Sequence, residues 1–381
     1  MNGKQTVVLP DTLVAQLIVN AATLSNYLQR DFEAISAQRN TLRSRLISES
    51  KIIKVNTAGQ PLSKTFAIDG AHLAEIDRAS AYSASCAVRV GQAYQVNDQS
   101  SCLTILPHVA SLNTLSSGLM IMQEIMMAVR VLEEIPDAVC LIDGSRISAI
   151  IAINSFYTGL ERDLPNQLGN WQRLVKGDSD REPGRTLSLF ESKDWLTPYL
   201  TNSAIVGNLK LVTTTTMIND YTPDWLGRFD DKTFAALVLE NGEALSEIPL
   251  PAPKQPYHIN NAYPFFSQLN RKGGVGDQLT EPNNPNRLYH IYYKPDSAHG
   301  VFKIELNGSF LSDTNKLSRL FAWWWQEIQS PDLQEPYSYY IADRFAKEAV
   351  SVAKNALREI SRRDVSTASW AWFFTQPYRT E

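Results

Sequence analysis

The chain has 381 residues, of which 44% are hydrophobic and 20% charged, with a formal net charge of −4 at pH 7. These values are ordinary for a globular protein with a sizeable core, and they argue against a basic protein that attracts nucleic acid through its overall charge. No apolar stretch approaches the roughly 20 residues of a membrane span, and the first thirty residues show no secretory signal pattern. Three cysteines without zinc-type spacing favour reduced thiols and a cytoplasmic location.

The first predicted element is a helix over residues 10–48. Apolar residues recur there at helical spacing, and Asp11 after Pro10 is a suitable N-cap. Four arginines gather toward its end: Arg30, Arg39, Arg43 and Arg45. We interpret them as part of a solvated helix face, with a stripe that faces phosphate as the alternative.

Strand-like runs follow, and their turn-like flanks predict adjacent antiparallel strands. They occupy residues 65–69, 84–91 and 102–110. A helix is predicted over residues 113–135, where leucine, methionine and valine recur every three or four positions. Pro136 ends that helix, and a short apolar strand follows at residues 138–143. This order of elements predicts an α/β protein with a mixed sheet.

The middle of the chain is less regular, and its C-terminal part is again strongly patterned. Strand-like segments occur at residues 186–193, 207–215 and 234–240, a β-hairpin is predicted at 289–295 and 300–306, and two helical pieces occupy 315–363. We divide the chain into an N-terminal helical segment (1–50), a main domain (51–365) with irregular insertions near 157–185 and 241–286, and an aromatic C-terminal tail (366–381).

Two of the apolar strands end in an Asp-Gly pair, at Asp69 and at Asp143. The tip of a strand holds a carboxylate rigidly, and the glycine lets the chain turn or lets another group come close. If the two strands are neighbours, the two carboxylates would suit Mg²⁺ or Mn²⁺, which prefer oxygen ligands. The alternative is a pair of unrelated Asp-Gly turns.

Glu124 is the unusual residue of the predicted helix, because methionines surround it and most faces of the helix are apolar. An ionised glutamate in such a place is costly unless it is paired or binds a metal, although it could also lie on a single wet face. Asp343 lies between Ile341 and Phe345 near the start of the last helix. It could belong to the same site, or its carboxylate could serve only to stabilise the helix dipole. Together these acids form the pattern of a two-metal, ribonuclease H-like nuclease centre.

The motifs KTFAIDGA, MQEIMMAVRVLEEIPDAVCLIDGS, SLFESKDWLTP, RLYHIYYKP with VFKIEL, and EPYSYYIADRFAKEA occur in this order. The series resembles the NurA nuclease family. The resemblance implies an RNase H-like mixed sheet flanked by helices, with helical N- and C-terminal additions. It also implies a homodimer and a DNA nuclease, dependent on Mn²⁺ or Mg²⁺, with exonuclease and single-strand endonuclease activity. The family partners a HerA-type hexameric ATPase that translocates DNA, which suits DNA end processing or anti-phage defence.

The resemblance also implies roles for single residues. Asp69, Glu124 and Asp143 match positions of metal ligands. Lys193, in a Ser-Lys pair expected after a strand, would meet the scissile phosphate. Asp343 falls at a C-terminal polar position that is histidine in some members, and we assign it as a further catalytic metal ligand.

Other readings of the sequence remain open. An actin-like ATPase or sugar kinase also carries two strand-tip Asp-Gly pairs, but it needs further Thr or Gly residues to hold ATP phosphates, and no Thr follows Asp69 or Asp143 closely. A non-catalytic adaptor of a DNA-translocating ATPase is the non-enzymatic alternative. His72, three residues past Asp69, could face the site. The run Trp323 to Trp325 should bury at least one face and could also offer a dimer or partner surface.

Overall fold

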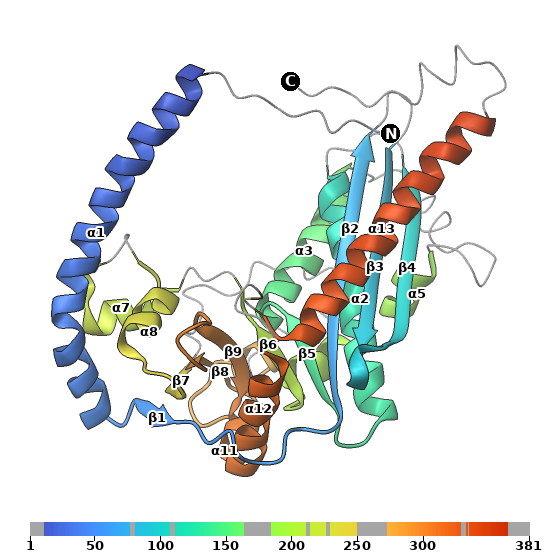
Figure 1. Cartoon of the computed structure of the whole chain (residues 1–381). Helices are drawn as coiled ribbons and strands as arrows, with labels where there is room; N and C mark the ends of the chain where they lie inside the picture. Colours follow the sequence, from blue (N-terminus) through green and yellow to red (C-terminus); the bar gives the residue numbers. More distant parts are fainter. Residues whose placement is uncertain are drawn as a thin grey trace.

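The computed structural model describes residues 11–76, 81–106, 111–163, 184–210, 214–225, 229–249, 273–328, 333 and 335–364. A nine-stranded sheet with the order β1-β7-β8-β9-β6-β5-β2-β3-β4 runs through these residues. Helices pack on its two faces (Figure 1). The predicted α/β architecture with a mixed sheet flanked by helices is therefore confirmed.

The strands that carry the two Asp-Gly pairs are neighbours. β2 (Thr65–Ile76), β3 (Ala81–Val90) and β4 (Val96–Leu106) form the expected antiparallel series. β5 (Val139–Asp143) pairs with β2 in parallel, and β6 (Ile205–Asn208) continues in parallel on the other side of β5. Part of the expected third strand, residues 107–110, lies outside the described residues.

One expectation about β2 is wrong, because this strand does not end at Asp69. It continues to Ile76, paired with β3 throughout. Only the pairing with β5 stops there, after Ile68 opposite Ile142. Asp69 therefore marks the point at which one edge of β2 loses its neighbour, and Gly70 lies inside the strand.

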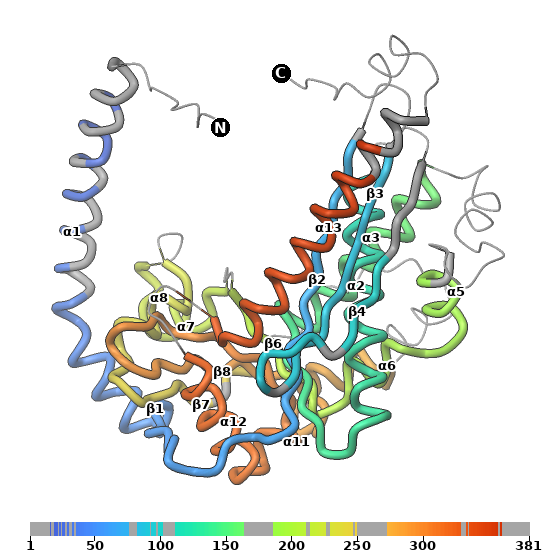
Figure 2. The backbone as a smooth tube through the Cα atoms, turned by 45° about the vertical axis from the view of Figure 1, so that its right-hand side comes forward, coloured from blue at the N-terminus to red at the C-terminus, as the bar shows by residue number. Residues whose placement is uncertain are grey.

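Two helical layers enclose this part of the sheet. α2 (Leu112–Glu134) and α3 (Arg146–Asp163) build the core on one face. α12 (Thr314–Glu327) and α13 (Tyr337–Asp364) build the core on the other, where α13 crosses β2 and β3 (Figure 2). Among the described residues, α2 alone is long and apolar enough to cross a membrane, but 72% of its most apolar window is buried inside the fold, as expected of a core helix.

The remaining strands form the other half of the sheet. They are β1 (Ile52–Lys54), β7 (Glu243–Pro249), β8 (Leu288–Lys294) and β9 (Phe302–Asn307), all antiparallel to one another where they pair, and β9 is antiparallel to β6. The predicted β8–β9 hairpin is confirmed. The shorter elements are α5 (Gly184–Ser192), α6 (Leu196–Thr201), α7 (Thr216–Tyr221), η2 (Pro223–Trp225), α8 (Asp231–Val238), α10 (Val275–Gln278), α11 (Gly308–Ser312) and η1 (Gln92–Tyr94).

Two segments expected as strands are helices. Residues 186–193 lie in and just after α5, and residues 234–240 lie mostly in α8. In α8 the side chain of Asp230 accepts a hydrogen bond from the backbone N–H of Thr233, at 2.8 Å, which is an N-cap contact. A short apolar run is compatible with a strand and with a buried helix, so the run alone does not predict which of them forms. In α8 the capping residue Asp230, outside the run, favours the helix.

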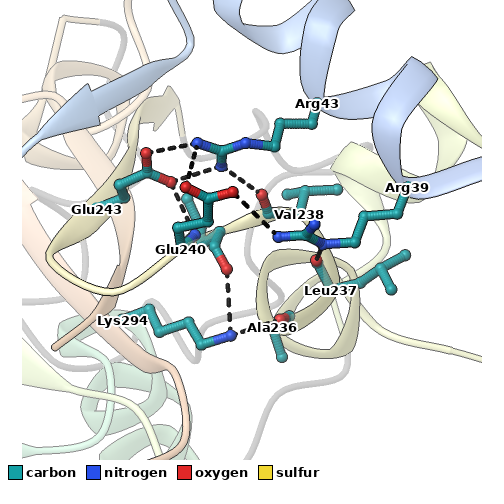
Figure 3. Close-up of polar contacts among 9 residues, drawn as sticks. Arg39, Arg43, Ala236, Leu237, Val238, Glu240, Glu243 and Lys294 are labelled. Carbon is teal, nitrogen blue, oxygen red and sulfur yellow. Dashed lines mark hydrogen bonds and ion pairs between the residues drawn. The ribbon is translucent and has the colours of Figure 1, made fainter. Parts of the chain in front are cut away.

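The N-terminal helix is confirmed as α1 (Asp11–Ser48), most of which extends away from the sheet (Figure 1). Its C-terminal part is anchored by Arg43, whose guanidinium binds both carboxylate oxygens of Glu243 at 2.6 Å (Figure 3). Arg39 donates to the carbonyl oxygen of Leu237 at 2.9 Å. These arginines hold α1 against α8 and β7, which does not favour the alternative of a stripe that faces phosphate.

The tryptophan run of α12 divides as expected, since Trp323 and Trp324 are buried and Trp325 is 43% exposed. The aromatic tail (366–381) and much of the two proposed insertions lie outside the described residues. The domain boundaries stay predictions.

Candidate metal centre

Asp69 and Asp143 point to the same face of the sheet. Residues of a strand alternate between the two faces, and Ile68 and Ile142 belong to the core on the α2 side. The side chains one position further along each strand therefore lie on the α13 side. Asp69 is 4% exposed, and Asp143 is half-buried at the end of β5. The two strands thus bring the two predicted carboxylates together.

Glu124 approaches β2 beside Asp69, at Gly70. It comes from α2, which packs on the face of the sheet opposite to the one that Asp69 and Asp143 point to. A Cβ atom at Gly70 would lie 2.4 Å from Glu124 Oε1 and 2.6 Å from Met120 Cγ, so only a glycine leaves room for this carboxylate against β2. The contact occurs where β5 has ended and no longer covers that edge of β2. Burial, followed by the charges of Asp69 and Asp143, raises the pKa of Glu124 well above its ordinary value.

Asp69 has a strongly perturbed pKa. Burial and then Asp143 raise the pKa of Asp69 to about 8, against an ordinary value of 3.8. One oxygen, Oδ1, accepts a hydrogen bond from the N–H of Gly70 at 2.8 Å. The other, Oδ2, is buried and has no hydrogen-bond donor. A buried acceptor without a donor is costly, which marks Oδ2 as an atom suited to a cation.

Lys210 is the functional candidate that the sequence analysis missed. Its ammonium lies 3.0 Å from Asp143 Oδ2, 3.9 Å from Asp69 Oδ2 and 2.7 Å from a carboxylate oxygen of Glu335. Burial opposes its charge, but Asp143 and Asp69 hold the pKa of Lys210 above its ordinary value. The only feature of the sequence that could have indicated Lys210 is its position. It lies two residues after the end of β6, the parallel strand next to β5.

Asp343 lies close enough for its charge to raise the pKa of Asp69, after the larger effects of burial and Asp143. Its own partner is Lys347, one turn further along α13, with a distance of 2.7 Å between Oδ2 and the ammonium. The structure therefore brings Asp343 to the edge of the centre.

Lys193 is not brought together with the carboxylates. It follows α5, where a strand was expected, and its ammonium binds Glu133 at 2.7 Å. Glu133 lies nine positions beyond Glu124 on α2, which is about 14 Å along the helix axis. His72 faces Asn113, with 3.3 Å between Nε2 and Oδ1, and Asn113 lies near the other end of α2.

The turn after Asp143 is held firmly. Gly144 has φ = 90°, in the left-handed region that favours glycine, and its N–H donates to the carbonyl oxygen of Asn208 at 2.8 Å. Just before it, the carbonyl oxygen of Ile142 accepts a hydrogen bond from the buried hydroxyl of Tyr339, at 2.9 Å. The last residue of β5 is thus fixed from both sides.

These residues fit a hard divalent cation by their chemistry. All candidate ligand atoms are carboxylate oxygens, and the buried Oδ2 of Asp69 accepts no hydrogen bond. Burial and neighbouring acidic charges raise the pKa of both Asp69 and Glu124. Within the part of the chain that the structure describes, no three acidic, histidine or cysteine side chains already form a complete ligand set. The Lys210 ammonium neutralises the pair Asp69 and Asp143 instead, so cation binding would require these side chains to rearrange.

A mixed sheet flanked by helices, with acids delivered by two neighbouring parallel strands, is an RNase H-like α/β fold. Among solved structures, the chain is similar in fold to NurA nucleases. The NurA nuclease from Sulfolobus solfataricus aligns over 94% of this chain and 99% of its own, with a TM-score of 0.57 and 14% identity. A second NurA structure covers 96% of this chain and all of its own, with a TM-score of 0.50 and 11% identity.

A third structure, NurA bound to dAMP and manganese, covers 92% of this chain and 98% of its own, with a TM-score of 0.54 and 11% identity. No protein-family model matches the chain, and no curated protein matches it significantly. The predicted resemblance is confirmed at the level of fold, over nearly the whole length of the chain.

The actin-like alternative gains no support from the geometry. That fold uses its Asp-Gly pairs in loops that hold phosphate, whereas Gly70 lies within β2 and packs against Glu124.

Proposed function

We propose that this protein is a divalent-metal-dependent nuclease that hydrolyses phosphodiester bonds in DNA. One observation carries the proposal: on a NurA fold, Asp69, Glu124 and Asp143 converge from three elements on one buried, electrostatically strained centre. A purely structural core would not gather three acids whose charges and burial raise the pKa of Asp69 and of Glu124, because the arrangement destabilises the fold. Perturbed groups of this kind concentrate at functional sites.

Asp69, Asp143 and Glu124 would hold the cation. A bound Mn²⁺ or Mg²⁺ supplies Lewis-acid activation of water and charge stabilisation at the phosphate. Asp69 contributes Oδ2, which is buried and accepts no hydrogen bond, and Asp143 contributes the carboxylate that now binds Lys210. Asp343 would assist from the edge of the centre, as a further ligand or through its charge.

Lys210 would act on the substrate. If Asp143 held the cation, the Lys210 ammonium would be free to donate to a phosphate oxygen, and its 2.7 Å contact with Glu335 would keep it beside the centre. Its raised pKa keeps it charged throughout the physiological range. We therefore assign to Lys210 the contact with the scissile phosphate that the sequence predicted for Lys193.

The test is a cleavage assay on linear double-stranded and single-stranded DNA with Mn²⁺, comparing the wild type with Glu124→Gln and Asp143→Ala. We expect both variants to lose cleavage. Glu134→Gln is the matched control, since Glu134 lies on the same helix but is exposed, and it should cleave like the wild type. Full activity in Asp143→Ala would refute the proposal, and wild-type cleavage that persists after chelation of all divalent metal would refute its metal dependence.

Three finer proposals rest on the resemblance. They are exonuclease together with single-strand endonuclease activity, a homodimer, and a HerA-type hexameric ATPase as partner in DNA end processing or anti-phage defence. Light scattering, which gives the molar mass in solution, tests the dimer by comparison with the chain mass of 42.7 kDa. Addition of such an ATPase to the cleavage assay tests the partnership, with faster degradation of linear duplex DNA as the expected result.

A further inference from the structure

A further acidic residue lies behind the centre, on a strand that carries none of the proposed ligands. Glu305 of β9 is fully buried. Its Oε2 accepts a hydrogen bond from the hydroxyl of Ser145 at 2.5 Å, and its Oε1 accepts one from the backbone N–H of Arg146 at 2.9 Å. Both donors belong to the turn that begins immediately after Asp143. Glu305 therefore binds the segment whose conformation sets the direction of the Asp143 side chain.

The same turn is the start of α3. The Ser145 hydroxyl accepts a hydrogen bond from the N–H of Ile147 at 3.2 Å while it donates to Glu305, so one side chain caps the helix and joins it to β9. Gly207 of β6 lies between them. A Cβ atom there would lie 2.7 Å from the carbonyl oxygen of Gly144 and 3.1 Å from Glu305 Cβ, so β6 leaves space for the turn and the glutamate to approach closely.

The charge of Glu305 is maintained inside the protein. Burial alone would raise its pKa, but His290, Arg146 and Ser145 outweigh it, so the pKa of Glu305 lies below its ordinary value. Arg146 is itself fully buried, with Nε 3.6 Å from Glu305 Oε1, and its Nη1 donates to the carbonyl oxygens of Leu200 and Asn202 at 3.1 Å. A buried ion pair contributes little net stability, so stability alone does not account for this pair.

Helix capping alone does not account for this arrangement. Asp231, another buried carboxylate, accepts hydrogen bonds from the N–H groups of Thr216 and Met217 at 2.9 Å and thereby caps α7, a helix that carries none of the proposed ligands. Glu305 is different because its two hydrogen-bond donors lie two and three residues from a proposed metal ligand. Groups that orient ligands in this way are a general requirement of metal sites.

We propose that Glu305 is a positioning residue that holds the Gly144–Arg146 turn so that the Asp143 carboxylate faces the cation. The inference rests on the proposed function, because it needs a metal at the centre. It predicts that Glu305, although it is not a ligand, controls the affinity for Mn²⁺. In Glu305→Gln the negative charge is lost, and the amide NH2 faces either the Arg146 N–H, which removes that contact, or the Ser145 hydroxyl, which must then turn from donor to acceptor.

The test measures Mn²⁺ affinity of the full-length protein by electron paramagnetic resonance of free Mn²⁺, together with cleavage rates as a function of Mn²⁺ concentration. We expect Glu305→Gln to bind Mn²⁺ about 10- to 100-fold more weakly. Excess Mn²⁺ should restore much of its cleavage rate, because the ligands are intact. Ser145→Ala should show a smaller loss in the same direction, and Ser145→Thr, which keeps the hydroxyl, should recover it.

Asp231→Asn is the matched control, since it also neutralises a buried carboxylate that caps a helix. It should lower the melting temperature and leave Mn²⁺ affinity unchanged. If Glu305→Gln does not fold, the comparison of Ser145→Ala with Ser145→Thr decides. Wild-type affinity in Ser145→Ala and in any folded Glu305→Gln overturns the positioning role. A wild type that binds no Mn²⁺ at all overturns the proposed function itself, so the two failures are distinguishable.

Discussion

A substitution at Gly70 would perturb the centre while keeping every proposed ligand residue. In Gly70→Ala the new Cβ would lie 2.4 Å from Glu124 Oε1 and 3.0 Å from the backbone carbonyl oxygen of Cys86. The β3 backbone is held by the sheet, so the Glu124 side chain must move. Ordinary contact begins near 3.4 Å, so the carboxylate shifts by 3.4 − 2.4, or about 1 Å. A displacement of that size at a reacting centre costs roughly 100-fold in rate.

We therefore expect Gly70→Ala to lower kcat/KM for Mn²⁺-dependent cleavage of single-stranded DNA by about 100-fold. Overpacking should also lower the free energy of unfolding, by about 1–3 kcal/mol. Gly59→Ala is the control, because its Cβ meets nothing nearer than Ser318 Oγ at 3.8 Å. A folded Gly70→Ala protein with wild-type kcat/KM would show that Glu124 does not depend on this close approach, and the geometric reasoning would fail.

Three further predictions concern charge at the same centre. Lys210→Met should lower kcat by about 10²–10³-fold, as expected for loss of a donor to developing charge. It should bind Mn²⁺ at least as tightly as the wild type, because a competing cation is gone. Lys193→Met, which loses the ion pair with Glu133 and the contact with the Trp195 ring, should leave both kcat and Mn²⁺ affinity unchanged, and equal kcat values for the two variants would reject our choice of lysine. In the metal-free protein, Asp69 has a folded pKa of about 8 and an unfolded pKa near its ordinary value, so folding takes up a proton between these two values. The contribution of Asp69 to the free energy of unfolding therefore falls as the pH rises from about 4 to 8 and then levels off, and the stability gained in Asp69→Asn should grow over the same interval to a few kcal/mol, which urea unfolding at several pH values would measure. Mn²⁺ at 100 times its Kd should stabilise the wild type by about 2.7 kcal/mol and Asp143→Ala far less, and equal thermal shifts in the two proteins would place the metal elsewhere.

The sequence predicted the acidic part of the centre because local pattern was enough. Asp69 and Asp143 each follow an apolar strand, and Glu124 stands out in a helix that is otherwise apolar. Each observation concerns a few neighbouring residues, and parallel pairing of β2 with β5 then brings two of the acids together. What the pattern could not show was that β2 continues past Asp69, since the continuation depends on pairing with β3 rather than on the residues at the strand tip.

The basic part of the centre lay beyond such reasoning. Lys210 and Glu335 are separated by 125 positions (335 − 210) and meet only through the order of strands and the path of α13. Lys193 looked suitable because a strand was expected before it, but that segment folds as α5 and pairs Lys193 with Glu133. A lysine carries no periodic signal of its function, so only the tertiary structure distinguishes the two.

The order of these residues along the chain has a consequence for synthesis. Asp143 leaves the ribosome 200 residues before Asp343 (343 − 143), and α13, which covers the paired acids, is made after every strand of the sheet. At typical translation rates this interval lasts about 10–40 s. During that time the acids lack Glu335, Tyr339 and the wall that α13 provides, so a nascent chain cannot hold a finished centre. If the proposed function holds, the protein therefore gains its activity only after residues 335–343 have been synthesised and α13 has docked.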